Sequence, residues 1–171
     1  RWKVPANPKG GDGGLSYLGP DPAAYQDAYL LKSKASDAAW AALVELCHTL
    51  ANVPADELEA ALNPIFDIDG ALWHLAMENV FVDHDGYMSR ASDYNLYRDP
   101  AGRFHLVPHD SNETFRYSGR GGGPSSLGDS EQVDPFLHAD SDERPVIRRL
   151  LAIPHLRARY AAHVRAIVDE W

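Results

Sequence analysis

Apolar side chains recur at helical spacing in several stretches of the chain. The first stripe consists of Trp40, Leu43, Cys47 and Leu50. Residues three or four positions apart share one face of a helix, so this stripe predicts a helix over residues 37–51, with Ser36 as its N-cap. A shorter helix is expected over residues 55–62. It should end at Asn63-Pro64, because the residue before a proline disfavours the helical conformation.

Three more helices follow from the same periodicity. One is expected over residues 69–80, capped by Asp69, and its apolar stripe is Leu72, Leu75, Ala76 and Val80. The last two are expected over residues 144–152 and 154–171, and Pro154 suits a first helical position. The stripe of the final helix consists of Leu156, Tyr160, Val164, Ile167 and Trp171. These stripes indicate a packed core rather than a cofactor site.

Two stretches alternate between apolar and polar positions, as strands do. They cover residues 94–97 and 103–107. The sequence between them, Asp99-Pro100-Ala101-Gly102, is typical of a tight turn, since proline presets φ and glycine tolerates positive φ. The pattern therefore predicts a β-hairpin. Another short strand is expected over residues 29–32, so the fold class is α+β, mostly helical with one central hairpin.

Glycine-rich stretches mark the expected loops. Residues 1–28 contain PKGGDGG, which lacks the Gly-Lys-Ser/Thr ending of a phosphate loop and is interpreted as a surface loop. Residues 118–129 read SGRGGGPSSLGD, a low-complexity composition that favours a flexible loop. The alternative for the second stretch is a substrate-facing loop similar to an activation segment.

Composition limits the class of protein. The chain has 171 residues, 44% of them hydrophobic, with a formal net charge of −9. An acidic chain without a basic stripe argues against nucleic-acid binding. The chain has no apolar run of roughly 18 residues, so no transmembrane helix is predicted. Cys47 is the only cysteine, which excludes an intrachain disulfide, and its helical context favours a buried side chain over a nucleophile.

Oxygen-bearing side chains gather on both sides of the predicted hairpin. Asp85 and Asp93 precede it, and Asp110 and Asn112 follow it. A hairpin brings its two ends together, so these side chains should meet at one end of a small sheet. Oxygen ligands of this kind suit Mg²⁺ and, through it, nucleotide phosphates. A calcium loop of the EF-hand type is rejected, because Phe81 and the residue at 92 are wrong for it.

The order of these parts is similar to that in protein kinases, where a catalytic loop, a hairpin and a metal-binding Asp follow one another. Neither H-R-D nor D-F-G is present, so an ordinary protein kinase is excluded. The segments D-G-Y at 85–87, R-A-S-D-Y at 90–94, L-Y at 96–97 and P-H-D-S-N-E-T-F at 108–115 resemble the CotH family of atypical, spore-coat-type protein kinases, found mainly in bacteria. V-D-P at 133–135 and RRLLAIPHLRARY at 148–160 also look like that family.

The resemblance covers residues 29–171 and implies the C-terminal portion of a kinase-like domain, whose N-terminal lobe is expected to precede Arg1. It divides the chain into a loop-rich entry at 1–28, the helices, acidic loop and hairpin at 29–115, a flexible loop at 116–143 and the last helices at 144–171. On this view the fragment alone could bind metal and still be inactive.

The resemblance also implies site roles. Asp110 is expected to be the chief Mg²⁺ ligand, and Asn112 to join it where relatives often carry Asp. Asp93, where many relatives carry Asn, is expected to complete the metal site, with Asn95 as its competitor. Asp85 is the expected catalytic base.

Several of these assignments have alternatives. Asp83 stands where the family has Asn, which leaves the choice of base open among Asp83, Asp85 and Asp93. Lys32, or its neighbour Lys34, is expected to contact nucleotide phosphates. Arg90 is expected either to bind a phosphate or to pair with an Asp of its own loop.

Glu113 is expected to be a supporting partner of the site or a solvated side chain. His109, where relatives often have Trp, is expected to pack beside the site rather than to act in catalysis.

The implied activity is ATP- and Mg²⁺-dependent phosphoryl transfer to Ser or Thr of a protein substrate, which the acidic charge suggests is basic. The family points to the spore coat, the cell envelope or secretion. Two alternatives stay open: a pseudokinase or structural spore or envelope binding module, and a metal-dependent phosphoesterase in which the same carboxylates activate water.

Overall fold

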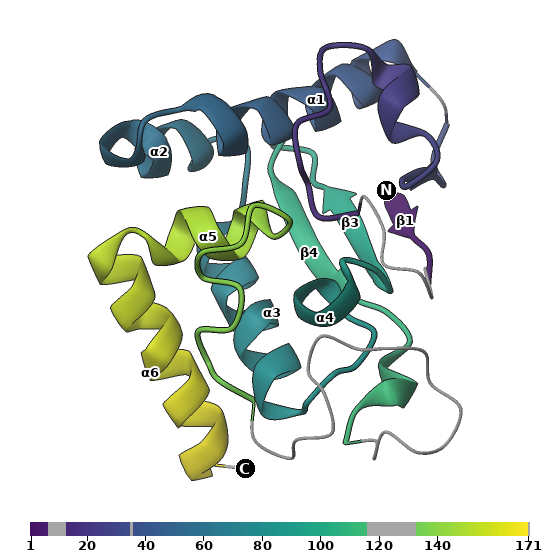
Figure 1. Ribbon diagram of the computed structural model, residues 1–171. Coiled ribbons are helices and arrows are strands. Elements are labelled where there is room, and N and C mark those ends of the chain that lie inside the picture. Colours follow the sequence, from purple (N-terminus) through teal and green to yellow (C-terminus); the bar gives the residue numbers. More distant parts are fainter. Residues whose placement is uncertain (7–12, 35, 116–132, 171) are drawn as a thin grey trace.

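The computed structural model describes residues 1–6, 13–34, 36–115 and 133–170. Its elements in chain order are β1 (Trp2–Val4), η1 (Pro22–Tyr25), β2 (Leu30–Leu31), α1 (Asp37–Asn52), α2 (Ala55–Leu62), α3 (Ile68–Val80), α4 (Tyr87–Arg90), β3 (Tyr94–Arg98), β4 (Phe104–Pro108), η2 (Ser111–Glu113), α5 (Pro145–Leu151) and α6 (Pro154–Glu170). Helices and an antiparallel sheet share the structure (Figure 1), which confirms the α+β class.

The sheet has the order β2-β1-β3-β4, and every neighbouring pair is antiparallel. The predicted hairpin is confirmed as β3 and β4. Its turn has the expected chemistry, because the Arg103 amide donates to the Asp99 carboxylate at 2.9 Å and Gly102 has a φ of +97°. The short strand expected near residue 30 is confirmed as β2.

The sequence missed β1. This strand lies inside a region expected to be loop, yet it forms the centre of the sheet between β2 and β3. Trp2 and Val4 are almost fully buried, and the Trp2 ring packs 5.4 Å from the ring of Phe104. Three residues are too few for a readable alternation, so only the partner strands identify this segment.

A second correction concerns the glycine-rich stretch PKGGDGG. Its last two residues, Gly13 and Gly14, are buried rather than on the surface, and the five before them lie outside the described residues. A Cβ on Gly13 would lie 2.1 Å from the carbonyl oxygen of Ala91. This close approach of two backbones requires glycine, and it places the N-terminal segment against the loop that follows α4.

The predicted helices are confirmed, with one change of cap. Ser36 caps α1 through a 3.1 Å hydrogen bond from the Ala39 amide. Helix α3 begins at Ile68 and is capped by Asp67, whose carboxylate accepts from the Gly70 amide at 3.3 Å. Asp69 was the expected cap, but it is the second residue of α3, and its carboxylate pairs with His163 of α6 at 3.1 Å.

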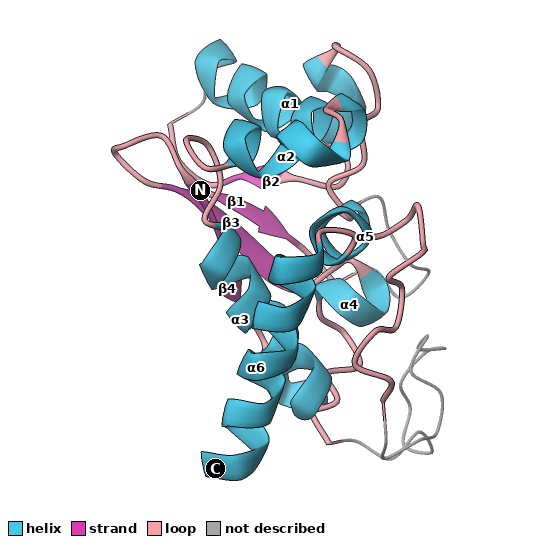
Figure 2. Ribbon diagram, turned by 90° about the vertical axis from the view of Figure 1, so that its left-hand side faces the viewer, coloured by secondary structure: helices cyan, strands magenta, loops and turns pink. Residues whose placement is uncertain are grey.

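The helices enclose one core. Helices α1 and α2 lie at one end of the molecule, and α6 runs beside α3 toward the other end (Figures 1 and 2). The stripes predicted from the sequence face this core, although Trp40, Val80 and Val164 are only half-buried. Trp171 and the stretch 118–129 fall outside the described residues. No helix within the described ranges combines the length and hydropathy needed to cross a membrane.

Candidate functional site

The acidic loop, residues 83–93, leaves the C-terminus of α3 through a sharp turn. The Asp83 carboxylate accepts hydrogen bonds from the amides of Asp85 and Gly86, at 3.0 and 3.2 Å. Only 8% of Asp83 is exposed, and this burial raises the pKa of its carboxyl group, with the charges of Glu78 and Asp85 adding to the rise. The Asp83 carboxylate therefore stabilises the turn through two backbone hydrogen bonds.

Asp85 forms an ion pair with Arg90 across the short helix α4. Its backbone carbonyl also accepts a 2.8 Å hydrogen bond from the Ser92 hydroxyl. Both contacts tie Asp85 to the C-terminal end of the segment that follows it. Of the two roles considered for Arg90, the structure places it with an Asp of its own loop.

Asp93 is the point where the negative charges meet. It immediately precedes β3, and its φ of +46° takes it out of the regular strand. Burial is the main reason that its pKa rises to about 6, and the charges of Asp85 and Asp110 raise it further, while Lys3 opposes them. Carboxylates from both sides of the hairpin thus act on one another electrostatically.

Asp110 and Asn112 reach this region from the other side of the hairpin. Asp110 follows β4, and Asn112 lies in η2; both side chains are exposed. Asp110 also has a positive φ, +58°, as do Val82, Ala91 and Phe115. Left-handed backbone is costly for residues other than glycine and collects at functional sites. The strain here is concentrated along the two segments that carry the carboxylates.

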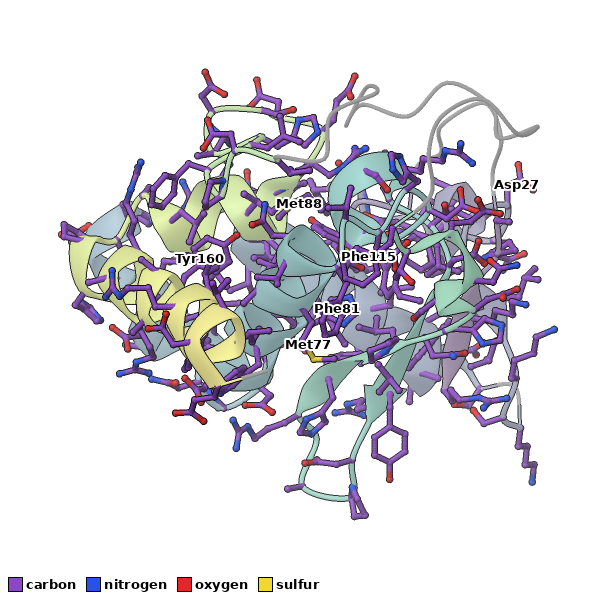
Figure 3. All side chains as sticks on the ribbon, turned by 90° about the horizontal axis from the view of Figure 1, so that it is seen from below. Asp27, Met77, Phe81, Met88, Phe115 and Tyr160 are labelled. Atoms are coloured by element: carbon purple, nitrogen blue, oxygen red, sulfur yellow. The ribbon has the colours of Figure 1, made fainter. Side chains whose placement is uncertain are left out.

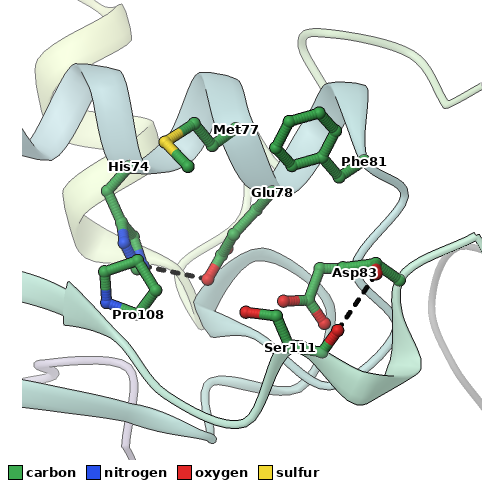
Figure 4. A pocket seen from close by; sticks show the side chains of 8 residues that line it. His74, Met77, Glu78, Phe81, Asp83, Pro108 and Ser111 are labelled. Atoms are coloured by element: carbon green, nitrogen blue, oxygen red, sulfur yellow. Dashed lines mark hydrogen bonds and ion pairs between the residues drawn. The ribbon is translucent and has the colours of Figure 1, made fainter.

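The two acidic segments are joined by their backbones. The His84 amide donates to the Glu113 carbonyl at 3.4 Å, and the Phe115 amide donates to the Phe81 carbonyl at 3.0 Å. The rings of Phe81 and Phe115, both labelled in Figure 3, lie 5.7 Å apart. Phe81 also lines a small cavity of about 30 Å³, together with residues that include His74, Glu78, Asp83 and Ser111 (Figure 4). The cavity has room for about one water molecule and not for a nucleotide.

A protein-family model described as CotH kinase protein matches residues 11–171. The chain belongs to the CotH kinase protein family. The match confirms the resemblance noted from the motifs around Asp85 and Asp110, and it indicates a kinase-like function. A search among curated proteins found no match.

The residues of this CotH family member fit a magnesium ion, although they do not form a closed cage. Among the residues that the structure describes, no three His, Cys, Asp or Glu side chains converge as a metal-binding group. Mg²⁺ usually keeps several waters and is held by one or two carboxylates together with substrate phosphates. An open group made of Asp93, Asp110 and the Asn112 amide suits that mode. The pKa of Asp93 is raised by burial first and by the charges of Asp85 and Asp110 second.

The structure does not bring Lys32 to this group. Lys32 follows β2, and its amide donates to the Arg1 carbonyl at 2.8 Å. The register Trp2↔Leu31 and Trp2↔Leu96 places it at the end of the sheet opposite Asp93. Lys34 is exposed, two residues further along the chain.

Lys3, rather than Lys32, is the lysine whose charge acts on this group of carboxylates. It pairs with Asn95 across β1 and β3 and is half-exposed, and its charge acts on Asp93. Sequence reasoning missed Lys3 because β1 itself was missed. Asn95, the competitor of Asp93, shares this face of the sheet with Lys3.

The remaining candidates lie at the edge of the site. His109 and Glu113 are half-buried, and Glu113 contributes its backbone carbonyl to the junction with His84. Glu78, to which sequence reasoning gave no role, is buried beside the acidic loop. Its signal in the sequence is weak, namely a carboxylate within an otherwise apolar helix, four residues after a histidine.

Proposed function

We propose that this CotH family member catalyses Mg²⁺-dependent transfer of a phosphoryl group from ATP to Ser or Thr of a protein substrate. The observation that carries the proposal is the shared electrostatic environment of Asp85, Asp93 and Asp110, which come from both sides of the hairpin. Phosphoryl transfer depends on positioning and on neutralising phosphate charge more than on covalent chemistry. A cluster of carboxylates can bind the metal ion that neutralises the phosphate charge.

The residues take distinct roles in this proposal. Asp110, Asp93 and Asn112 would hold Mg²⁺, which when bound neutralises phosphate charge. Asp85 orients the substrate hydroxyl and accepts its proton, while Arg90 fixes the direction of the Asp85 carboxylate through their ion pair.

Lys3, rather than Lys32, contacts the nucleotide phosphates in this proposal, because it is the lysine whose charge acts on Asp93. A protein substrate with basic residues around the acceptor suits the net charge of −9.

The fold-level part of the proposal concerns the arrangement of the domain. In this proposal the helices and the hairpin correspond to the C-terminal lobe of a kinase-like fold. The division of the chain at residues 28, 115 and 143 belongs to the same proposal. The support for it is the order of acidic loop, hairpin and second acidic segment, together with the family match over residues 11–171.

The decisive experiment follows labelled γ-phosphate from ATP into protein in the presence of Mg²⁺. It compares the wild-type chain with an Asp110→Asn variant. Incorporation that is lost in the variant supports the kinase. Phosphate released without labelling of protein would point to a phosphoesterase, and no nucleotide binding by the wild-type chain would end the proposal.

One contact favours a second candidate, a pseudokinase that binds nucleotide without transferring phosphate. The Asp85 carboxylate, the expected base, is already paired with Arg90. If that pair persists when substrate is bound, the proton acceptor is blocked. Mg-ATP binding by the wild-type chain, without incorporation, would select this candidate and the binding-module role that accompanies it.

A further inference from the structure

Glu78 is a buried carboxylate that contacts the acidic loop through the backbone. Only 6% of the residue is exposed. Its two carboxylate oxygens accept hydrogen bonds from the amides of Tyr87 and Met88, at 2.8 and 2.7 Å. These are the first two residues of α4, whose N–H groups have no partner within the helix. Glu78 thus caps α4 from a different helix, α3.

Two residues, His74 and Gly86, lie next to the Glu78 carboxylate. The Nε2 atom of His74, one turn earlier in α3, lies 2.9 Å from a Glu78 oxygen (Figure 4). A Cβ on Gly86 would lie 2.3 Å from the same oxygen, so a side chain at position 86 would displace the Glu78 carboxylate. The Glu78 carboxylate is therefore enclosed, with His74 on one side and Gly86 on the other.

Arg144 contacts the opposite end of α4. It directly precedes α5 and is 6% exposed. Its Nε atom donates to the Met88 carbonyl at 3.1 Å, and one of its terminal nitrogens donates to the Ser89 carbonyl at 3.0 Å. The last carbonyls of a helix also lack partners within it. A carboxylate at the N-terminus and a guanidinium at the C-terminus match the helix dipole at both ends.

Helix α4 depends on these two contacts for its order. A helix of four residues is too short to be stable by itself, because nucleation costs more than one turn recovers. It nevertheless sets the spacing between the two carboxylates on either side of it, Asp85 and Asp93. Arg90, which pairs with Asp85, belongs to α4 as well.

We infer that Glu78 and Arg144 are positioning residues, which hold α4 from its two ends and so fix the placement of Asp85 and Asp93. Neither touches the ligands of the proposed reaction. The inference rests on the proposed function in one respect, namely that Asp85 and Asp93 act on substrate and metal. The hold on α4 itself can be measured without that reaction.

The test of Glu78 is hydrogen exchange of the backbone amides in Glu78→Gln. The matched control is Glu59→Gln, which also breaks a Glu–His pair between helical residues, Glu59 with His155 at 2.7 Å, but away from α4. We expect the amides of Tyr87 and Met88 to exchange at least about tenfold faster in Glu78→Gln only, because a charge-assisted acceptor is lost there. Exchange in α1 and α6 should stay as in the wild type.

The test of Arg144 uses Arg144→Lys beside Arg149→Lys. Both arginines donate to backbone carbonyls, but Arg149 contacts Val53, away from α4. Lysine keeps the charge and loses the planar fork that reaches two carbonyls at once. We expect faster exchange over residues 87–93 in Arg144→Lys only, and Mg²⁺ binding, measured by calorimetry with Mg²⁺ alone, weakened about tenfold in Arg144→Lys and in Glu78→Gln.

The outcomes separate this inference from the proposed function. Unchanged exchange at α4, or faster exchange throughout the chain, overturns the positioning role, since the residues would then stabilise the whole core. Mg²⁺ affinity that stays within twofold of the wild type in both variants also overturns it. A wild-type chain that binds no Mg²⁺ overturns the proposed function, whereas local loosening of α4 in the variants would still support the hold exerted by Glu78 and Arg144.

Discussion

Both ends of the β3–β4 hairpin carry carboxylates, but the balance of positive and negative charge differs between them. At the turn, His105 lies between Asp67 and Asp99, with ring nitrogens 3.0 and 3.1 Å from their oxygens, and Arg103 reaches Asp67 at 3.3 Å. The hydrogen bond from His105 is the main reason that the pKa of Asp99 is lowered. Each carboxylate there has a cationic or donating partner, and together they fasten the hairpin to the start of α3.

At the other end the balance is reversed. Asp83, Asp85, Asp93 and Asp110 lie along two joined segments, where Arg90 is engaged by Asp85. The pKa of Asp93 rises to about 6, through burial first and the neighbouring charges second. The same residue type therefore shows opposite shifts at the two ends of one hairpin. The carboxylates at the turn serve the fold, whereas the charged form of Asp93 at the acidic loop is disfavoured by its surroundings.

The largest effect should come from Asp110→Asn. Removal of one charged metal ligand should lower phosphoryl transfer by about a hundredfold or more, because the site acts mainly through electrostatic stabilisation. The measurement is the initial rate of γ-phosphate incorporation with Mg²⁺. Asp99→Asn, at the turn, is the matched control and should retain the wild-type rate within about twofold. If the rate of incorporation fell equally in the two variants, the acidic loop would have no special role in the reaction.

How far the sequence foretells this contrast depends on how local each signal is. The hairpin follows from Asp99 and Gly102 within four residues, and the gathering of Asp93 and Asp110 follows from the hairpin. The choice of Lys3 over Lys32 does not, because it depends on β1 lying between β2 and β3, a long-range pairing.

The cap of α3 shows the same limit. Asp67 and Asp69 are equivalent as sequence signals, and only the contact of Asp69 with α6 decides between them. The positive φ of Asp93 has only a weak local signal, because aspartate adopts this conformation more often than most residues but far less often than glycine.

Mg²⁺ should stabilise the wild-type chain by binding at the acidic end. At a concentration about ten times the dissociation constant, the expected gain is about 1.4 kcal/mol, or roughly 3–5 °C in Tm for a chain of this size. Thermal unfolding with increasing MgCl₂, against NaCl of matched ionic strength, measures it. The gain should disappear in Asp110→Asn and persist in Asp99→Asn. A gain that survives in Asp110→Asn would place the cation elsewhere.

Asp93→Asn should stabilise the metal-free protein. A carboxyl whose pKa is raised in the folded state binds its proton more tightly there, so stability falls as pH rises from about 4 to above 6 and stays lowered at neutral pH. Removal of the charge should recover about 1–2 kcal/mol at pH 7, a figure reduced from the full shift to allow for solvent screening. Urea unfolding at pH 4 and pH 7 tests this, and the variant and wild type should converge at the lower pH. A destabilised Asp93→Asn at pH 7 would contradict the assignment of excess charge to this end.

The smallest effect, of opposite sign, is expected for Asp99→Asn. The pKa of Asp99 is lowered in the folded state, so its charge contributes stability above the ordinary carboxyl pKa, and that contribution is lost as pH falls through the folded pKa. Asp99→Asn should therefore be slightly less stable than the wild type at neutral pH and equal to it in acid. Because Asp93→Asn shifts stability in the other direction over the same titration, one urea series with both variants compares the two ends directly. Shifts of the same sign would mean that the turn and the acidic loop do not differ in charge balance, and the case for a cation at the loop would then lack its electrostatic support.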